Sequence, residues 1–392
     1  MKLETLVRQS LEEWSAEARV PAGLADRALR RRTRRRIRGI ALVAGAAAAV
    51  AATTFAVDVG APTAPRPATR PTPMDTSLHT DPAHSPPQRF VAAGQTAISA
   101  YYIRQTSSIG GKTVFRDTWY LYRPATGGYQ RTPWANLDVA PGLRQAAVLE
   151  GPLPAARVGL VDLKTQKVTR WITLEYPAGG LAWSPDGTRL LVTTYDRSVD
   201  VPAGPGTSSR TGYYLVNVAS GKAAFHTLPA GTDNVDARQD LGWSRNGRLL
   251  WAPTDTTPTK RFYDLSGTPR PAPPHEDQTY VDEAGLSPSG RYLSRGNPYV
   301  GPGRTNPHGP ATAVEDVTTS KQVGVQPVEQ LRAWADDTHL IAVACDVKRC
   351  TGKGEFHNRY VLVSVDGKSI TPLTGYQNSD APGAWHPLFT HR

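Results

Sequence analysis

Cysteine is scarce in this chain of 392 residues, which has only Cys345 and Cys350. Two thiols cannot complete a cysteine-rich zinc site or a scaffold held by several disulfides. The nine histidines are scattered, and the chain has neither an H-E-x-x-H nor a G-x-S-x-G motif. These absences exclude the common sites of zinc metalloproteases and α/β-hydrolases. We therefore expect a protein that is not an enzyme, with no catalytic residues, no cofactor and no metal.

Two short motifs come near to functional signatures without matching them. The stretch IGGKTV from Ile109 resembles a phosphate-binding loop, but Thr106 occupies the position of its first glycine. We interpret this stretch as a hairpin loop. The stretch SPDGT from Ser184 resembles the Asp box of sialidases, but it lacks the residue that separates Asp from Gly in that motif. Neither stretch predicts an active site.

Acidic side chains are too few to balance the basic ones, and the formal net charge is +11. The excess is uneven: residues 1–39 hold 11 Lys and Arg against 5 Asp and Glu, and the rest of the chain holds 34 against 29. The main body is therefore nearly balanced, and the high isoelectric point does not predict nucleic-acid binding.

Residues 1–38 combine an amphipathic helix, over about the first 20 residues, with an Arg-rich segment. The apolar side chains of the helix recur at helical spacing, at Leu3, Leu6, Val7, Leu11 and Trp14. A lone amphipathic helix must bury this stripe somewhere. It could lie on a membrane surface or self-associate, or it could dock to a cytoplasmic protein partner.

The one long apolar run, in residues 39–59, follows eight arginines between Arg27 and Arg38. The 18 residues from Ile40 span ~27 Å as a helix, close to the hydrocarbon thickness of a bilayer. Since clustered positive charge stays on the cytoplasmic side, we expect a single-pass membrane protein with its N-terminus inside and its C-terminal body outside. The alternatives are DNA binding by the Arg run and a cleaved signal peptide, for which Thr54-Phe55-Ala56 has the small-x-Ala form.

Residues 60–88 contain eight prolines and few apolar side chains. This composition cannot build a core, so we expect a disordered, Pro-rich linker.

From residue 89 to residue 392 one pattern recurs. LAWSPDGTRLLV at Leu181 is repeated as LGWSRNGRLLWA at Leu241, AGLSPSGRYLS at Ala284 and LRAWADDTHLIAVAC at Leu331, with weaker copies earlier and a truncated GAWHPLF at Gly383. The average spacing is near 49 residues, a period typical of β-propeller blades. In each copy an alternating strand enters a Pro/Asp/Gly corner and a second strand leaves it. We therefore expect structural corners, whose marker residues are Trp183, Pro185, Asp186, Gly187, Trp243, Gly247, Pro288, Gly290, Trp334 and Trp385.

The W-S-P-D-G corner followed by an apolar strand resembles the TolB-like and WD-repeat-like propellers of bacterial extracytoplasmic proteins. The resemblance covers about 300 residues and implies an all-β fold. We expect six blades, with seven possible because the 60-residue interval after Trp183 could hold extra strands. The truncated last copy supplies one strand, which should pair with the first blade and close the ring.

Cys345 and Cys350 frame a four-residue loop at the end of a predicted hairpin. In an exported domain we expect them to form a disulfide. A metal site that adds His357 is the alternative, but three ligands do not complete a tetrahedral site.

These features predict a membrane-anchored, extracytoplasmic binding module for a protein or cell-envelope ligand, acting in transmembrane signalling or envelope assembly. The alternative is a propeller enzyme acting on glycans or lactones, with carboxylates gathered at the central channel. The available acids are Asp186, Asp196, Asp200, Asp240, Asp282, Asp316 and Asp337. The sequence does not identify the ligand.

Overall fold

The computed structural model describes residues 75–201, 208–231, 238–254, 258–296, 311–346 and 357–392, which belong to a compact unit spanning Pro71–Arg392. The expected N-terminal helix, Arg-rich segment and membrane span lie outside the described residues, as does most of the linker. Within the described part no helix is long and apolar enough to cross a membrane. Every element assigned there is a β-strand.

The strands form five sheets. The first contains β1 (Ala92–Ala93), β2 (Thr96–Ile109), β3 (Lys112–Arg123), β4 (Gly128–Arg131) and β24 (Trp385–His391). The second contains β5 (Asn136–Val139), β6 (Gln145–Leu149), β7 (Ala155–Asp162), β8 (Lys167–Trp183), β9 (Arg189–Tyr195), β10 (Arg210–Asn217) and β11 (Ala223–Thr227). The third contains β12 (Gly242–Trp243), β13 (Leu250–Pro253), β14 (Lys260–Tyr263) and β15 (Pro269–Arg270). The fourth contains β16 (Tyr292–Arg295), β17 (Thr312–Asp316) and β18 (Lys321–Gln326), and the fifth contains β19 (Gln330–Trp334), β20 (His339–Cys345), β21 (His357–Ser364), β22 (Ile370–Pro372) and β23 (Gln377–Asn378).

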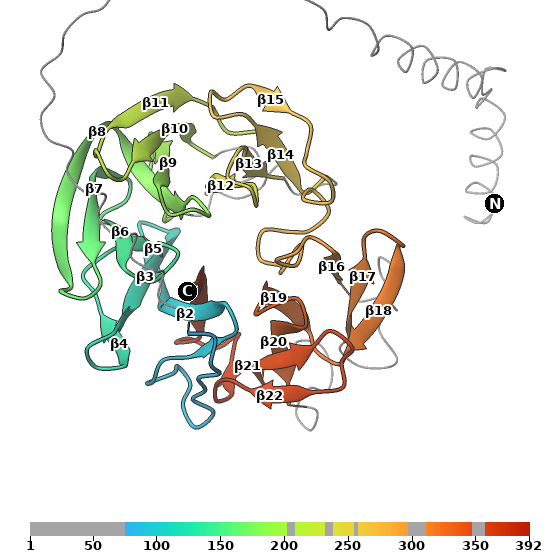
Figure 1. Cartoon of the computed structure of the whole chain (residues 1–392). Coiled ribbons are helices and arrows are strands. Elements are labelled where there is room, and N and C mark those ends of the chain that lie inside the picture. Colours follow the sequence, from blue (N-terminus) through green and yellow to red (C-terminus); the bar gives the residue numbers. More distant parts are fainter. Residues whose placement is uncertain (1–74, 202–207, 232–237, 255–257, 297–310, 347–356) are drawn as a thin grey trace, which may run out of the picture. The chain divides into compact units, whose positions relative to one another are not determined.

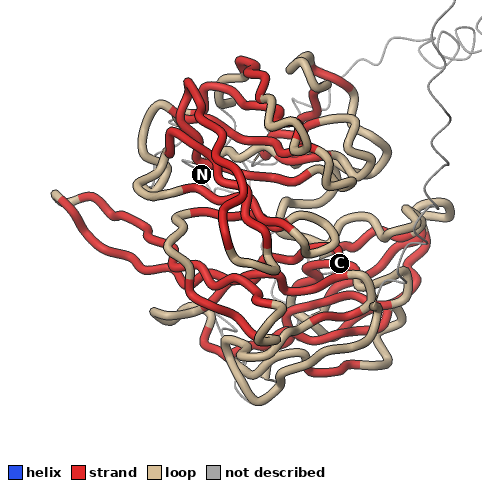
Figure 2. The backbone as a smooth tube through the Cα atoms, turned by 60° about the vertical axis from the view of Figure 1, so that its left-hand side comes forward, coloured by secondary structure: helices blue, strands red, loops and turns tan. Residues whose placement is uncertain are grey.

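The sheets follow one another around a common centre in chain order, which is a propeller-like arrangement (Figure 1). Neighbouring strands within each sheet are antiparallel. One hairpin, formed by β2 and β3, extends beyond the other strands as a two-stranded arm (Figure 2). The expected all-β, propeller-like fold is confirmed.

The first sheet is closed by the C-terminus of the chain. β24 pairs with β2 from Thr96↔His391 to Ile103↔Trp385, and β2 pairs on its other edge with β3. Because β24 covers the edge that β2 would otherwise expose, the first and last segments of the body are joined by hydrogen bonds. This confirms the predicted closure strand.

The described residues form five sheets, whereas the sequence predicts six blades, with seven as the alternative. The cause is β8, a single strand of 17 residues. Its first half pairs with β7 and its second half with β9, so what the repeat pattern predicts as two blades is one continuous seven-stranded sheet. No turn interrupts β8, since the sequence between its halves lacks the Asp-Gly or Ser-Gly corner found elsewhere.

The predicted boundary between linker and body at residues 88 and 89 is corrected. Asp81 is 3% exposed, and its Oδ2 accepts the backbone N–H groups of Gln88 and Arg89 at 2.8 and 3.0 Å. The Asp81 N–H donates to the carbonyl of Leu373 at 2.8 Å. The segment from Asp75 thus lies on the body, because one carboxylate and several backbone bonds hold it there although its composition cannot build a core.

The apolar core lies between neighbouring sheets and not at the centre. One cluster joins Ala100 and Leu121 of the first sheet to Leu137 and Val161 of the second. Other clusters join the second sheet to the third and the fifth sheet to the first. Because each sheet buries its faces against its neighbours, the innermost strands are free to line a channel.

Candidate functional site

The predicted corners share one hydrogen-bond pattern, which the turn Ser184–Arg189 illustrates. The Gly187 N–H donates to the Ser184 carbonyl at 2.8 Å, and the Arg189 N–H donates to the Ser184 hydroxyl at 2.9 Å. The carboxylate of Asp186 accepts from the Ser184 hydroxyl and from the Thr188 N–H. Gly187 has φ 68°, a conformation that favours glycine. The residues Ser-Pro-Asp-Gly therefore build a turn and not a reactive site.

The same bonds recur in the turns that begin at Ser244 and Ser287. Their glycines, Gly247 and Gly290, have φ 64° and 77° and donate to the carbonyl of the leading serine at 2.8 Å. The turn at Ser364, which the repeat alignment did not include, has the same geometry with Gly367.

Three of the corner tryptophans connect neighbouring blades. The indole N–H of Trp183 donates to the Asp138 carbonyl at 3.1 Å, that of Trp243 to the Ala182 carbonyl at 2.9 Å, and that of Trp334 to the Gly285 carbonyl at 3.0 Å. Each acceptor belongs to the innermost segment that precedes the tryptophan's own blade. The recurring tryptophan thus fixes the spacing of the ring.

Trp385 is not equivalent to these residues, contrary to the prediction. It begins β24, whereas Trp183 ends β8 immediately before its corner. Its side chain is 1% exposed, and its indole N–H donates to the Ser85 hydroxyl at 2.9 Å. The W-H-P triplet resembles the W-S-P of a corner. It lies at the start of β24, whereas Trp183 lies at the end of its strand, so the repeat alignment misplaced Trp385.

The corners contact each other around the whole ring. We call the side of the body that carries them the corner face. It is defined by residues 94–95, 141–143, 184–188, 244–248, 287–291 and 335–338, together with the neighbouring turns 162–167, 217–222, 316–321 and 364–368, whose backbone N–H groups at Leu163, Val218, Val317 and Val365 donate to carbonyls in or beside the corners. Successive contacts include Arg189 to the Gly247 carbonyl at 2.8 Å, Ser289 N–H to Asp337 at 2.9 Å, Gln95 N–H to the Ala335 carbonyl at 2.7 Å and Gly142 N–H to the His391 carbonyl at 2.8 Å.

A cavity of about 690 Å³ opens between these corners at the centre of the ring. Its wall includes turn prolines, strand residues from β19 and β24, and several polar groups; the main contributors are Pro141, Pro185, Arg245, Pro288, Arg332, Trp334, Phe389 and His391. The two hydroxyls of the wall are already engaged, because Thr96 donates to the Trp334 carbonyl and Thr390 bonds to Ser99. The cavity offers arginine and ring contacts to a ligand, not a nucleophile with its base.

Away from the corner face, polar and charged side chains are paired within and between sheets. The Tyr195 hydroxyl donates to Asp240 at 2.7 Å, and Arg238 contacts the other oxygen of that carboxylate at 3.2 Å. Burial raises the pKa of Tyr195 well above its usual value. Arg104 forms a bidentate pair with Asp117, with both distances 2.8 Å.

A further acid, Asp138 on β5, was not among the predicted site residues. Its Oδ2 accepts the Trp183 N–H at 2.8 Å, and its Oδ1 accepts the Val139 N–H at 2.9 Å. Burial raises the pKa of Asp138 to about 6. Its two donors come from its own strand and from Trp183, which lies 45 residues away in the sequence, so no local signal marks it.

Of the acids named for an enzymatic alternative, Asp200 and Asp240 both interact electrostatically with Arg238, and the others lie elsewhere. Asp186 and Asp316 cap turns on the corner face, and Asp337 accepts the Ser289 N–H there. Asp240 and Asp282 have arginine partners, Arg238 and Arg332. Among the described residues no group of three His, Cys, Asp or Glu side chains has a geometry that could hold a metal ion. The expected disulfide stays a prediction, because Cys350 lies outside the described residues.

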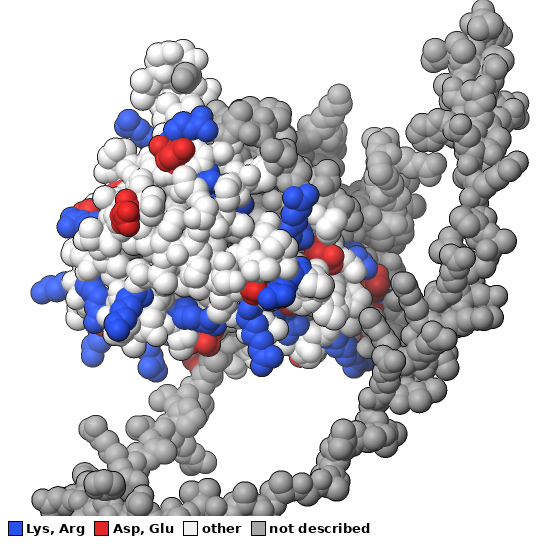
Figure 3. All heavy atoms as spheres, turned by 90° about the horizontal axis from the view of Figure 1, so that it is seen from above, with Lys and Arg blue, Asp and Glu red and all other residues white. Residues whose placement is uncertain are grey.

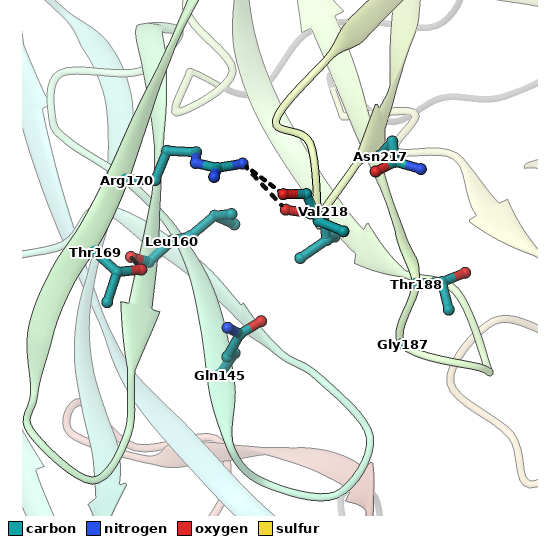
Figure 4. A pocket seen from close by; sticks show the side chains of 9 residues that line it. Gln145, Leu160, Thr169, Arg170, Gly187, Thr188, Asn217 and Val218 are labelled. Carbon is teal, nitrogen blue, oxygen red and sulfur yellow. Dashed lines mark hydrogen bonds between the residues drawn. The ribbon is translucent and has the colours of Figure 1, made fainter. Parts of the chain in front are cut away.

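A second cavity, of about 670 Å³, lies on the flank of the second sheet (Figure 4). Arg170 projects across it from β8 and donates to the carbonyls of Val218 and Ala219 at 3.4 and 3.1 Å. Arg170 thereby links the two halves of the second sheet, and its role in this cavity is structural.

Comparisons with known proteins find similarity at the level of the fold. No protein-family model matches the sequence, and a search of curated proteins gives no match. Solved structures that resemble the chain include TolB from Acinetobacter baumannii, with 13% identity over 75% of this chain and 67% of that one and a TM-score of 0.38. A chain of the mitotic checkpoint complex has 13% identity over 88% of this chain and 99% of that one, with a TM-score of 0.38. Hydrazine synthase from Kuenenia stuttgartiensis has 13% identity over 64% and 69%, with a TM-score of 0.34.

Proposed function

We propose that this protein is a membrane-anchored, non-enzymatic binding module whose ligand site is the cavity at the centre of the corner face. The observation that carries the proposal is the composition of that cavity. Its wall joins corner turns from several blades to Arg245, Arg332, Trp334 and Phe389, side chains that are typical of protein-binding surfaces.

We further propose that the ring has six blades. The second sheet then counts as two blades that share β8, its first half serving as an outer strand and its second half as an inner strand. Six corner turns support this count, since each touches the next and the last touches the first.

The favoured occupant of the cavity is a protein segment that brings a carboxylate. Arg245 is exposed, and its guanidinium donates to the Pro288 carbonyl at 2.5 Å without forming an ion pair at contact distance with any described residue, so it can bind an acidic partner. Trp334 and Phe389 lie in the same wall and supply apolar area. Binding such a segment requires no reactive group in the cavity. The two hydroxyls of the wall, those of Thr96 and Thr390, already form hydrogen bonds within the protein.

Site-specific photocrosslinking in cells tests the site. A photoreactive phenylalanine analogue replaces Phe389 in the cavity or, as a control, Val323, which is 42% exposed on the outer strand β18. We expect a discrete crosslinked product from position 389 and none from position 323. Equal patterns from both positions would overturn the cavity as the ligand site.

The N-terminal segment completes the proposal. We propose that residues 39–59 span the membrane and that the helix around Leu6 and Leu11 binds a cytoplasmic protein, so that ligand binding outside is relayed inside. The support is its apolar stripe, which residues 1–38 cannot bury alone. Leu6→Asp and Leu11→Asp should abolish co-purification of that partner while the protein stays in the membrane fraction; a helix that only rests on lipid would lose no partner.

A further inference from the structure

The corner face carries exposed cations that have no carboxylate within ion-pair distance in the described part of the chain. They lie in or beside its turns, at Arg144, Lys164, Lys167, Lys222, Arg248 and Lys321. Several cations elsewhere on the body are paired, as in Arg104–Asp117, Arg238–Asp240 and Arg295–Glu315. Figure 3 shows basic side chains gathered along one edge of the body.

Three acids of the corner face form hydrogen bonds within their own turns and not with the side chains of these six cations. Asp162 accepts the Thr165 N–H at 2.7 Å, Asp186 that of Thr188 at 3.0 Å and Asp366 that of Lys368 at 3.1 Å. Hydrogen bonds within the turns hold the pKa of each of these acids below its usual value. One oxygen of each carboxylate is thus held by its own turn, and Asp366 also pairs with Lys368 at 3.3 Å, which leaves the six cations named above without an ion-pair partner among the described residues.

The chain enters the body at the same face. Arg392 donates to the Gly94 carbonyl at 2.8 Å and to the Ser77 carbonyl, and its guanidinium lies 3.8 Å from Asp75. Gly94 belongs to the first corner, and an added Cβ at that position would meet the Ala335 carbonyl of the last corner. Asp75, the first residue that the structure describes, therefore lies at the corner face.

We infer that the corner face docks on the anionic lipid surface of the membrane in which the protein is anchored. The inference rests on the proposed anchor. Charge complementarity favours lipid phosphates: each basic side chain near such a surface strengthens binding roughly fivefold, within a screening length of about 8 Å at physiological salt. The ligand cavity would then open toward the membrane, so that its ligand is a protein segment close to the bilayer.

Energy transfer to the bilayer tests the orientation in the full-length protein. A donor dye is attached at Ala219→Cys, exposed on the corner side, or at Ser107→Cys, exposed on the β2–β3 arm. The protein is reconstituted into vesicles that contain an acceptor lipid and either phosphatidylcholine alone or 30% phosphatidylglycerol. We expect transfer from position 219 to at least double in phosphatidylglycerol vesicles and to return to the phosphatidylcholine level in 0.5 M NaCl, with no change at position 107.

Two triple variants separate charge from folding. Lys164→Glu, Lys222→Glu and Arg248→Glu together reverse unpaired corner cations, while Arg116→Glu, Arg131→Glu and Arg197→Glu reverse exposed cations elsewhere. Only the first set should abolish the lipid-dependent transfer. Equal transfer in both lipids, or binding of soluble polyphosphate without any rise in transfer, would overturn the inference.

Flotation of the vesicles after a carbonate wash checks the anchor separately. Protein that fails to float contradicts the proposed function, whereas floating protein without lipid-dependent transfer contradicts only the docking.

Discussion

At the scale of single residues, the ring is held by groups that the repeat brings to the same place in successive blades. An indole N–H that reaches a carbonyl of the previous blade satisfies two buried polar groups at once. Leaving such a carbonyl without its donor costs more than the bond itself contributes, because the carbonyl stays away from water.

Trp243→Phe should therefore destabilise the body although it keeps an aromatic ring. The variant leaves the Ala182 carbonyl without its 2.9 Å donor, and we expect a loss of about 1–2 kcal/mol in the free energy of unfolding. Urea denaturation followed by tryptophan fluorescence measures it. Trp134→Phe is the matched control, since Trp134 makes a ring contact with Trp171 and no indole hydrogen bond is assigned to it. Equal losses in the two variants would contradict the role of the indole N–H.

Asp138 predicts a dependence of stability on pH. Its pKa of about 6 lies above the value of about 3.9 in an unfolded chain. Between about pH 4 and pH 6 the folded state keeps a proton that the unfolded state has lost, so the contribution of Asp138 to stability falls as the pH rises through this window. Asp138→Asn does not titrate, so the wild type should lose at least about 1 kcal/mol relative to this variant from pH 4 to pH 7.

Unfolding free energies at pH 4, 5, 6 and 7 check this. Asp186→Asn is the control with the opposite sign, because hydrogen bonds from Ser184 and Thr188 lower the pKa of Asp186. The contribution of that carboxylate is lost as the pH falls. A pH-independent difference between the wild type and Asp138→Asn would show that Asp138 stays ionised in the folded protein.

These two predictions differ in how far the sequence alone could have led to them. Pro185, Asp186 and Gly187 are predictable because a turn is a local structure, and their chemistry specifies it within four residues. Asp138 is not, because its donors come from its own strand and from Trp183 in another. The same holds for the central cavity, whose wall is assembled from residues 95–391.

At the scale of elements, the repeat period predicts where strands occur but not where one sheet ends. β8 shows why: the strand runs from Lys167 to Trp183 through Pro177, Gly179 and Gly180, residues that commonly mark the end of a strand. The closure strand was predictable, because a copy that supplies one strand needs a partner at the other end of the repeat array. The register of this strand was not predictable, and for that reason the repeat alignment placed Trp385 at the end of β24 instead of at its start.

Deleting residues 383–392 should remove most of the stability of the body. The deletion exposes the edge of β2, removes the buried ring of Trp385 and frees the segment around Ser85 that this ring holds. Loss of one fully buried Trp side chain alone costs about 3–5 kcal/mol. We expect no cooperative thermal transition above 37 °C by circular dichroism.

A deletion elsewhere provides the control. Residues 107–114 form the outer part of the β2–β3 arm, where Ser107 to Ile109 are exposed, and Phe115, whose N–H donates to the Asp200 carbonyl, is kept. Replacing these residues by Asn-Gly should keep the hairpin register and change the melting temperature by only about 2–3 °C, since little apolar surface is lost. If the two deletions melt alike, the C-terminal strand does not close the ring.

At the scale of the whole molecule, charge is distributed unevenly over three parts of the protein, and each part has its own consequence. The Arg cluster before residue 39 predicts the orientation of the anchor, the nearly balanced body predicts a soluble outer domain, and within that body the corner turns concentrate unpaired cations. The sequence could indicate the first two, because they depend on position along the chain. The third needed the fold, since it depends on which turns share one face.

The topology predicts what a protease meets on intact cells. With residues 1–38 inside and the body outside, added protease should cut first within the Pro-rich stretch before Asp75, which no described sheet protects. An N-terminal tag should survive on a fragment that stays with the membrane, whereas a C-terminal tag should be released with the body. Lysed cells, in which both tags become accessible, are the control.

A mature protein that begins near Val57 would contradict the anchor and favour the cleaved, secreted form. Cleavage after Ala56, at the small-x-Ala site, would leave the body with no attachment to the bilayer.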